Sequence, residues 1–340
     1  MKRNALSTNM TKKLLGSMVV ALTVFLPVVA DAQLNGENLL GDVGVKSGTQ
    51  PHPGFYVANL YSRYFTDSII GVDGEPLVFD PTGAGSQTIH ATVPLAIYVS
   101  PKKFMGAHYG MMAVMPFATG SLEAPGLGLS EKASMGASDL YVMPVQLGWH
   151  LDRADAVAGF AFFAPTGRHT AGASDNLGKA MWSYEVSGGT TVYLDKQRTF
   201  SVATTAYWET HSKKDGEVQI EEVTVRDLKV GQLLTLEGGV GKSFLHGAVS
   251  VGVAYYAQWK LTSDQVELSA PVSHTAELPD RHRVWGVGPD VTIPIATKTR
   301  VISLVNVRYL WETGARLKTQ GQSLLITSTF PWGGIKIPGR

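Results

Sequence analysis

Most of the chain after residue 53 alternates between apolar and polar positions with a period of two, and helical periodicity is scarce. A strand whose two faces have different surroundings produces this pattern, because successive side chains point to opposite faces. The alternating segments are Gly54–Thr66, Thr88–Val99, Ala107–Phe117, Asp139–Leu151, Asp155–Ala164, Trp182–Leu194, Arg198–Glu209, Gln232–Phe244, Ala248–Trp259, His282–Ile293, Arg300–Glu312 and Gln322–Trp332. The pattern predicts an all-β protein.

The connections between these segments alternate in length. Those after the even-numbered segments are short, such as Asp152–Ala154 and Asp195–Gln197, whereas most of those after the odd-numbered segments are long, such as Thr210–Gly231. Outer-membrane barrels have an even number of antiparallel strands, short periplasmic turns and long external loops. We therefore expect a transmembrane up-and-down antiparallel β-barrel of about 12 strands over residues 54–332, located in the cell outer membrane.

The two faces of single segments differ as the wall of such a barrel requires. In Arg300–Glu312, we expect Val305 and Val307 to face lipid and Asn306 to face the lumen. A charge on the lipid face costs a few kcal/mol at the midplane, so the polar face must point inward. Asp155–Ala164 is apolar on both faces, and its orientation cannot be assigned from the pattern.

The first 32 residues have the order of a Sec signal peptide. A basic stretch precedes the apolar run Leu14–Ala30, and Ala30-Asp31-Ala32 supplies the small residues that signal peptidase accepts. We expect export by the Sec machinery and cleavage near Ala32; an N-terminal membrane anchor is the alternative. Residues 33–53 are polar and Gly-rich, and we expect a flexible periplasmic segment there, with a plug across the barrel mouth as the alternative.

Composition narrows the functions that remain. The chain has no Cys, is 44% hydrophobic and has a formal net charge of +1, which excludes a disulfide scaffold, a disordered chain and a basic nucleic-acid binder. Gly238–Ser243 looks like a phosphate-binding loop, but Leu236 occupies the position of the first glycine that the loop needs. The nine His residues lack metal-ligand spacing. We expect no catalytic residues, no cofactor, no metal and no nucleic-acid partner.

Several stretches together resemble one known family. They are Phe163–Arg168, Asn176–Gly178 and Trp182–Glu185; Gly231–Leu236 and Gly238–Gly241; Gly286–Pro289 and Arg308–Ala315; and Gly321–Leu324 with Thr329–Pro331. In order and spacing they are similar to the bacterial outer-membrane family named for the meta-pathway of phenol degradation, whose members are described as transporters. The resemblance implies an outer-membrane β-barrel and uptake of small, often aromatic, molecules, and it carries no catalytic residues.

The end of the chain departs from the family pattern. Assembly machinery usually reads a terminal aromatic residue, and here the last aromatic residues, Phe330 and Trp332, are followed by a tail over residues 333–340. The exact end of the last strand therefore stays open, although we still expect the barrel-assembly machinery as a partner.

Seven charged residues are predicted to point into the barrel. They are Arg63, Glu185, Glu209, Glu237, Asp290, Arg308 and Glu312. They either line a polar path and tune which solute passes, or neutralise one another in a filled lumen. We expect Arg308 and Asp290 to share one wall and three of the glutamates to share another, which would favour neutral or cationic solutes.

The sequence therefore predicts a diffusive channel for small, aromatic or hydrophobic solutes, embedded in outer-membrane lipid and without enzyme activity. One alternative is a non-transporting structural or surface-binding barrel. A less favoured alternative is an outer-membrane hydrolase, for which His211 and Ser212 would be the nearest pair. Residues adjacent in a chain do not face each other as a base and its nucleophile must.

Overall fold

The computed structural model describes residues 36–77, 80–170, 173, 175–216, 218–220, 223–245, 249–269, 273–278, 281–332 and 334–336. The predicted signal peptide over residues 1–32 lies outside them, as does most of the predicted tail over residues 333–340. The described part of the chain contains no helix that is both long and apolar enough to cross a membrane.

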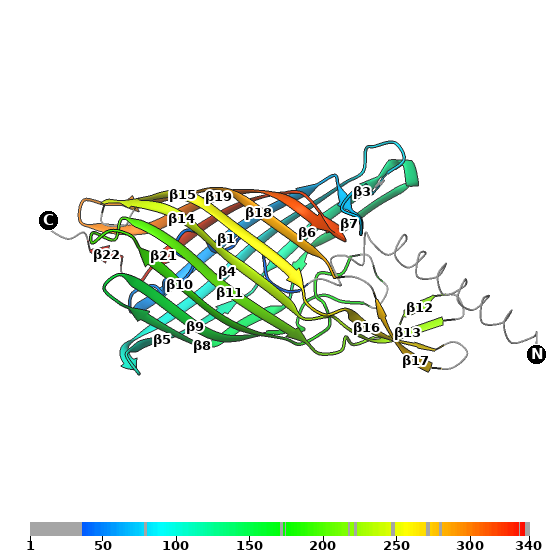
Figure 1. The fold of residues 1–340 in the computed structure, drawn as a ribbon, viewed down its shortest axis with the longest axis horizontal. Helices are drawn as coiled ribbons and strands as arrows, with labels where there is room; N and C mark the ends of the chain where they lie inside the picture. Colours follow the sequence, from blue (N-terminus) through cyan, green and yellow to red (C-terminus); the bar gives the residue numbers. More distant parts are fainter. Residues whose placement is uncertain are drawn as a thin grey trace, which may run out of the picture. The chain divides into compact units, whose positions relative to one another are not determined.

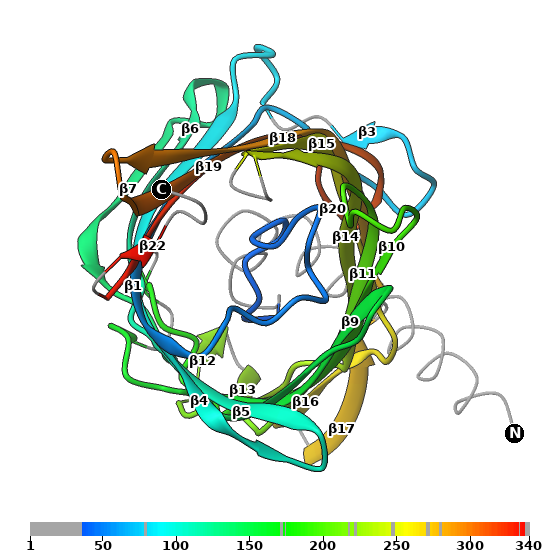
Figure 2. The same ribbon diagram turned by 90° about the vertical axis from the view of Figure 1, so that its left-hand side faces the viewer.

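Antiparallel strands close into a barrel (Figures 1 and 2). The wall strands are β1 (Gly54–Thr66), β4 (Ser86–Phe104), β5 (Ala107–Val114), β8 (Leu140–His150), β9 (Ala154–Ala164), β10 (Ser183–Tyr193), β11 (Phe200–His211), β14 (Leu233–Phe244), β15 (Val249–Lys260), β18 (Arg283–Ala296), β19 (Arg300–Arg316) and β21 (Gln322–Pro331). Each pairs with the next in this order, and β1 pairs with both β4 and β21, which closes the ring. The predicted all-β barrel of 12 strands is confirmed.

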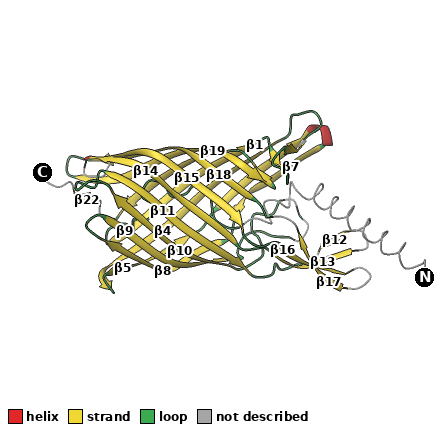
Figure 3. Cartoon of the chain, viewed as in Figure 1, coloured by secondary structure: helices red, strands yellow, loops and turns green. Residues whose placement is uncertain are grey.

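The remaining elements extend from the barrel (Figure 3). They are β2 (Ile69–Ile70), β3 (Pro76–Leu77), β6 (Phe117–Ala124), the 3₁₀ turn η1 (Pro125–Leu127), β7 (Leu129–Ala137), β12 (Val218–Ile220), β13 (Val223–Lys229), β16 (Asp264–Ser269), β17 (Ser273–Leu278), β20 (Lys318–Thr319) and β22 (Ile335–Lys336). Strands β12, β13, β16 and β17 form a sheet of their own, from two long loops at the same end of the barrel as β3 and β7 (Figure 1). Because long loops face outward in such barrels, we call this end extracellular and the short-turn end periplasmic.

β4 is longer than predicted because two different strands pair with the same edge of it, one along each half. Its periplasmic half pairs with β5, and its extracellular half pairs with β6, which continues into a hairpin with β7. β5 and β6 are separated by Met115 and Pro116. Since proline has no N–H to donate to the ladder, the predicted segment Ala107–Phe117 is split at this point.

The faces of the wall strands alternate between membrane and lumen. Val307 has 39% of its surface exposed on the outside, whereas its neighbour Asn306 lines the lumen, in agreement with the expected faces. On β9, which is apolar on both faces, Phe160 is exposed on the outside, and Val157 and Phe163 line the lumen. The unusual composition of β9 therefore reflects a lumen that is apolar on this side.

Val307→Arg is expected to impair assembly, because an arginine facing lipid near the bilayer midplane costs about 2–4 kcal/mol. Thr327→Arg is the matched control. Thr327 pairs with Asn306 on the adjacent strand and lines the lumen, where water and carboxylates can solvate a guanidinium. We expect the folded, heat-modifiable band on a gel to weaken for the first variant and to persist for the second. Equal folding of both variants would mean that the faces of β19 are assigned wrongly.

Residues 36–53, which we call the plug, lie inside the barrel and lead into β1 (blue in Figure 2). Their first residues contact Glu209 near the extracellular end of β11, and Thr49 contacts Asp155 near the periplasmic end of β9. The prediction of a flexible periplasmic segment is therefore wrong for these residues. The reason is that their backbone groups find hydrogen-bond partners on the lumen wall.

Candidate functional site

Wall carboxylates hold the plug at intervals of four residues along its length. The bonds run from Glu37 N to Glu209 Oε2 at 2.8 Å, from Gly41 N to Glu237 Oε1 at 2.9 Å, from Val45 N to Asp290 Oδ2 at 3.2 Å, and from Thr49 Oγ1 to Asp155 Oδ2 at 3.0 Å. The plug forms no helix and no strand, so its N–H groups have no regular partners of their own. Buried backbone groups require partners, and the carboxylates of β11, β14 and β18 supply them, while the carboxylate of β9 accepts from the Thr49 hydroxyl.

Glycine lets the plug approach the wall closely at two positions. A Cβ at Gly44 would lie 1.8 Å from Asp290 Oδ2, and a Cβ at Gly48 would lie 2.2 Å from the backbone carbon of Thr190 on β10. Both distances are far inside van der Waals contact. The Gly-rich composition of this segment therefore matches its position against the barrel wall.

Arg308 joins the plug to the wall. Its Nε donates to Asp290 Oδ2 at 2.9 Å, and its Nη1 donates to the carbonyl oxygen of Gly41 at 2.6 Å. Asn306 Nδ2 donates to the other oxygen of Asp290 at 2.6 Å. With Val45 N, this gives the Asp290 carboxylate three donors and the guanidinium two acceptors inside the barrel.

Six of the seven predicted residues point into the barrel. Glu185, Glu209, Glu237 and Asp290 are at most 1% exposed, and Arg308 is 6% exposed. The side chains of Glu185 and Glu209 belong to residues that pair directly across β10 and β11.

Glu312, the sixth, lies apart from these residues. It accepts hydrogen bonds from Tyr64 Oη at 2.8 Å and from Tyr256 Oη at 2.6 Å. The seventh residue, Arg63, was predicted wrongly. It is exposed and alternates along β1 with Ser62 on the buried face, so it lies on the outer surface, 5.7 Å from the ring centre of Phe65.

Charged side chains outside the membrane-spanning strands cluster at the extracellular end of the plug. Lys179 Nζ lies 3.7 Å from Glu37 Oε2. Burial raises the pKa of Glu37 to about 7, although Lys179 opposes the shift. Burial and the like charge of Lys179 lower the pKa of Lys214 to about 8. The Lys179–Glu37 pair and the nearby Lys214 thus lie at the point where the plug meets the loops.

A second polar cluster holds the plug at its periplasmic end. Asp155 is 1% exposed and accepts hydrogen bonds from Tyr193 Oη at 2.6 Å, from Arg198 Nη2 at 2.5 Å and from Thr49. His150 Nδ1 lies 3.1 Å from the same carboxylate. Sequence reasoning missed this group, because Asp155 begins a segment without a clear polar face. Among the described residues, no three His, Asp or Glu side chains are arranged as metal ligands.

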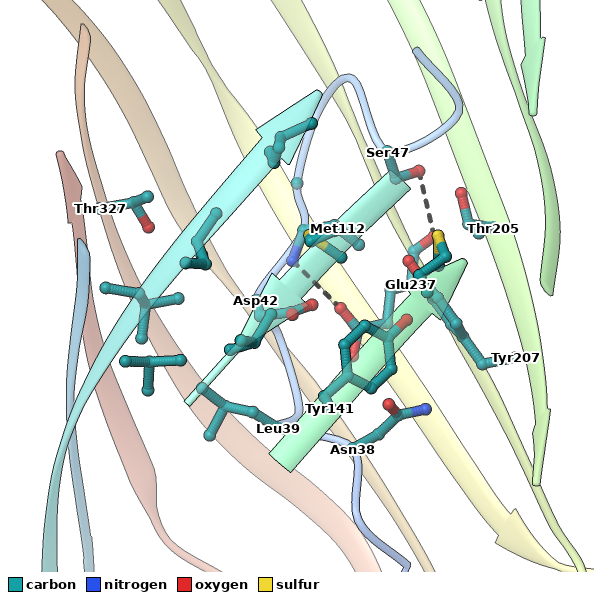
Figure 4. Close-up of a pocket in the computed structure, with 18 of the residues that line it drawn as sticks. Asn38, Leu39, Asp42, Ser47, Met112, Tyr141, Thr205, Tyr207, Glu237 and Thr327 are labelled. Carbon is teal, nitrogen blue, oxygen red and sulfur yellow. Dashed lines mark hydrogen bonds between the residues drawn. The ribbon is translucent and has the colours of Figure 1, made fainter. Parts of the chain in front are cut away.

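A cavity of about 660 Å³ lies between the plug and the opposite wall (Figure 4). That wall is apolar and belongs to strands β1, β4, β5, β8 and β9. Its main side chains are Leu60, Val93, Leu95, Ile97, Met112, Val114, Met143, Val157 and Phe163. The lumen is thus divided into an acidic side, which the plug covers, and an apolar side, which stays hollow.

The charged residues that line this cavity are mostly acidic. The acidic residues are Glu37, Asp42, Asp139, Glu185, Glu237 and Asp290, and the basic residues are Lys46, Lys179 and Arg308. Asp42, which sequence reasoning did not single out, projects from the plug into the cavity, and its carboxyl is hydrogen-bonded to that of Glu237. No periodic pattern marks residues 36–53, so the sequence offers no signal for its position.

Comparison with known proteins supports the fold. The model of a family described as "Putative MetA-pathway of phenol degradation" matches residues 66–327. The COG4313 outer membrane channel from Pseudomonas putida F1 is similar in structure, with a TM-score of 0.66 at 14% identity over 86% of this chain and 99% of that chain. The transport unit of the autotransporter AIDA-I from Escherichia coli has a TM-score of 0.50 at 10% identity over 93% of this chain and 97% of that chain. No curated protein matches the sequence.

Proposed function

Because the chain belongs to the family described as "Putative MetA-pathway of phenol degradation", and because an apolar cavity lies beside its plug, we propose that it is a passive outer-membrane channel for small hydrophobic or aromatic solutes. The division of the lumen carries this proposal. The plug engages the wall carboxylates, so a solute that enters meets the apolar wall of β1, β4, β5, β8 and β9.

The size and chemistry of the cavity support this class of solute. A volume of about 660 Å³ lies within the range of about 300–1,000 Å³ that is usual for small-molecule sites. Transfer of apolar surface from water onto an apolar wall is favourable, so the cavity would concentrate a hydrophobic solute without any chemical step. Selectivity then comes from the width and lining of the passage between plug and wall.

Filling the cavity is expected to slow uptake of an apolar probe by intact cells. Ala91→Trp places an indole in the cavity from β4, whereas Ala96→Trp places one on the lipid face of the same strand. We expect cells that express the wild type to take up N-phenyl-1-naphthylamine severalfold faster than cells without the protein. The Ala91 variant should approach the rate without protein, and the Ala96 variant should match the wild type.

The same cells provide the controls for location and assembly. Each variant should fractionate with the outer membrane and show heat-modifiable migration, since lipid is the proposed partner of the outer face. Uptake that is equal with and without the protein would contradict the channel function. Recovery of the protein from the soluble periplasm would contradict the proposed location.

The hydrolase alternative finds no support at the nearest candidate pair. Ser212 Oγ donates to the carbonyl oxygen of Lys213 at 2.9 Å and accepts from Trp182 N at 2.9 Å, so it is not bonded to His211. The absence of enzyme activity stays a prediction, and an esterase assay of the refolded protein tests it. The surface-binding alternative would place function in the sheet of β12, β13, β16 and β17, and it predicts no solute flux.

A further inference from the structure

Three histidines from three elements gather at the periplasmic end of the plug. His52 is the last residue but one of the plug, His108 lies on β5, and His150 is the last residue of β8. The ring centres of His52 and His150 are 5.5 Å apart, and those of His108 and His150 are 6.2 Å apart. None of the three lines the cavity, so contact with a solute there does not account for their proximity.

Two of these rings carry hydrogen on Nδ1, which leaves Nε2 as the atom that takes up a further proton. His150 Nδ1 lies 3.1 Å from Asp155 Oδ1, and His108 Nδ1 lies 3.0 Å from the carbonyl oxygen of Ser100. A carboxylate and a carbonyl only accept hydrogen bonds, so Nδ1 donates in both rings. His150 Nε2 is buried and has no hydrogen-bond partner among the described residues. A proton added there would create a buried cation whose new N–H lacks an acceptor, which is costly.

The charges around the rings do not favour further positive charge. Asp155, the acid that acts on His52, already accepts hydrogen bonds from Arg198, Thr49 and Tyr193. Lys46 of the plug also interacts with this carboxylate and with Arg198. While the rings are neutral, two cations, Lys46 and Arg198, share one carboxylate. Protonation of all three rings would raise the number of cations to five.

His52 is held less firmly than the other two rings. It is exposed, and it lies between Pro51 and Pro53, which have no N–H to donate to the wall. Its carbonyl oxygen accepts from Tyr56 Oη at 2.7 Å. The other two rings belong to wall strands that are paired along both edges. Repulsion between the rings therefore displaces the plug and leaves the wall in place.

The pKa of His52 reflects these surroundings. Partial burial lowers it, and the side chains of His150, Arg198 and His108 lower it further, whereas Asp155 opposes the shift. A histidine whose pKa is lowered in one state stabilises that state while its ring is neutral. The stabilisation is therefore complete above the ordinary histidine pKa of about 6.5 and is lost as the pH falls below it.

We propose that His52, His108 and His150 form a pH-sensitive latch, which holds the periplasmic end of the plug against the wall while the rings are neutral and releases it on acidification. Histidine suits this role because its charge changes between about pH 5 and 8. The latch controls access to the lumen whatever solute passes, so it goes beyond the proposed function. The contacts of the plug with Glu237 and Asp290 lie farther along the lumen and are not part of it.

The chain has no Cys, so a single introduced cysteine reports the position of the plug. Gln50→Cys places the thiol at a residue that is 1% exposed, close to His52, and Lys298→Cys places one in an exposed turn at the same end of the barrel. Each protein in lipid nanodiscs is labelled with a maleimide at about pH 5 and about pH 8, on either side of the ordinary histidine pKa. Dividing the rate for Gln50→Cys by that for Lys298→Cys corrects for the effect of pH on the thiol. We expect this ratio to rise severalfold at the lower pH.

Histidine variants in both cysteine backgrounds identify the groups responsible. His52→Gln with His108→Gln should abolish the rise, because glutamine is polar but does not titrate in this range. His52→Gln alone changes only the plug and should remove most of the rise, so the test stands even if the substitution on β5 impairs assembly. His169→Gln, in the loop between β9 and β10 at the extracellular end, should leave the rise intact.

Two outcomes would overturn the latch. One is a labelling ratio that does not change with pH when all three histidines are present. The other is a rise that persists in the variant that lacks both His52 and His108. Neither outcome would contradict the proposed channel, because uptake of N-phenyl-1-naphthylamine tests that function separately.

Discussion

Arg308→Met is expected to destabilise the barrel by roughly 3–5 kcal/mol, the range found when one partner of a buried ion pair is removed. Arg308 is 6% exposed, and Asp290 is 1% exposed. Without the guanidinium, Asp290 keeps donors from Asn306 and Val45 but loses its countercharge, and the carbonyl oxygen of Gly41 loses its donor. Urea titration of the protein refolded in lipid vesicles measures the change in the free energy of unfolding.

Two comparisons identify the cause of that loss. Adding Asp290→Asn to Arg308→Met removes the unpaired charge and should restore part of the stability. Lys213→Met breaks an exposed pair, Lys213 Nζ to Asp227 Oδ2 at 2.6 Å, and should have no measurable effect, because water screens it. If Arg308→Met were as stable as Lys213→Met, the pair would not anchor the plug to the wall.

The wall of the barrel could be predicted from the sequence because each strand borders two different media. That difference appears in the sequence as an alternation of apolar and polar residues within each strand. The bounds predicted for β1, Gly54–Thr66, are therefore correct, and β10 lies within one residue of its predicted segment. The alternation of short and long connections then indicated which ends of the strands are joined by turns and which by loops. No long-range information was needed for either step.

The same rule fails where the lumen itself is apolar. The inner face of β1 carries Ala58 and Leu60, which face the cavity side, so polarity did not mark it as the inner face. Arg63 was therefore assigned to the lumen although it lies outside, near the strand end, where an arginine can reach the headgroups. β9, which carries apolar residues on both faces, could not be oriented for the same reason.

The plug could not be predicted, because its position depends on contacts far apart in the sequence. The residues that hold it are separated from it by up to 267 positions, as for Gly41 and Arg308. From the sequence alone, a polar, Gly-rich segment is predicted to be flexible, because the carboxylates that accept its N–H groups cannot be identified. The predicted inward charges did hint at the plug. Acidic residues outnumber basic ones among them, so some of the buried carboxylates need hydrogen-bond donors from another part of the chain.

Substitution of the two close-contact glycines, Gly44→Val with Gly48→Val, is expected to displace the plug and raise ion conductance severalfold in planar bilayers. At Gly48 the obstacle is the backbone of Thr190, which belongs to a paired wall strand and cannot turn aside as a side chain would. At Gly44 the obstacle is the carboxylate of Asp290, which Arg308 and Asn306 hold in place. The plug is the part that must move.

The ion selectivity of the opened pore provides the second readout. Once the plug is displaced, Glu209, Glu237 and Asp290 face water and should favour cations, most strongly at low salt, where the Debye length is about 30 Å at 0.01 M. The reversal potential in a salt gradient measures this preference. Gly188→Ala is the control, because its Cβ meets only a carbonyl oxygen at 3.9 Å. Unchanged conductance in the double variant would show that the plug does not limit ion flow, and raised conductance without cation preference would mean that these carboxylates do not line the opened path.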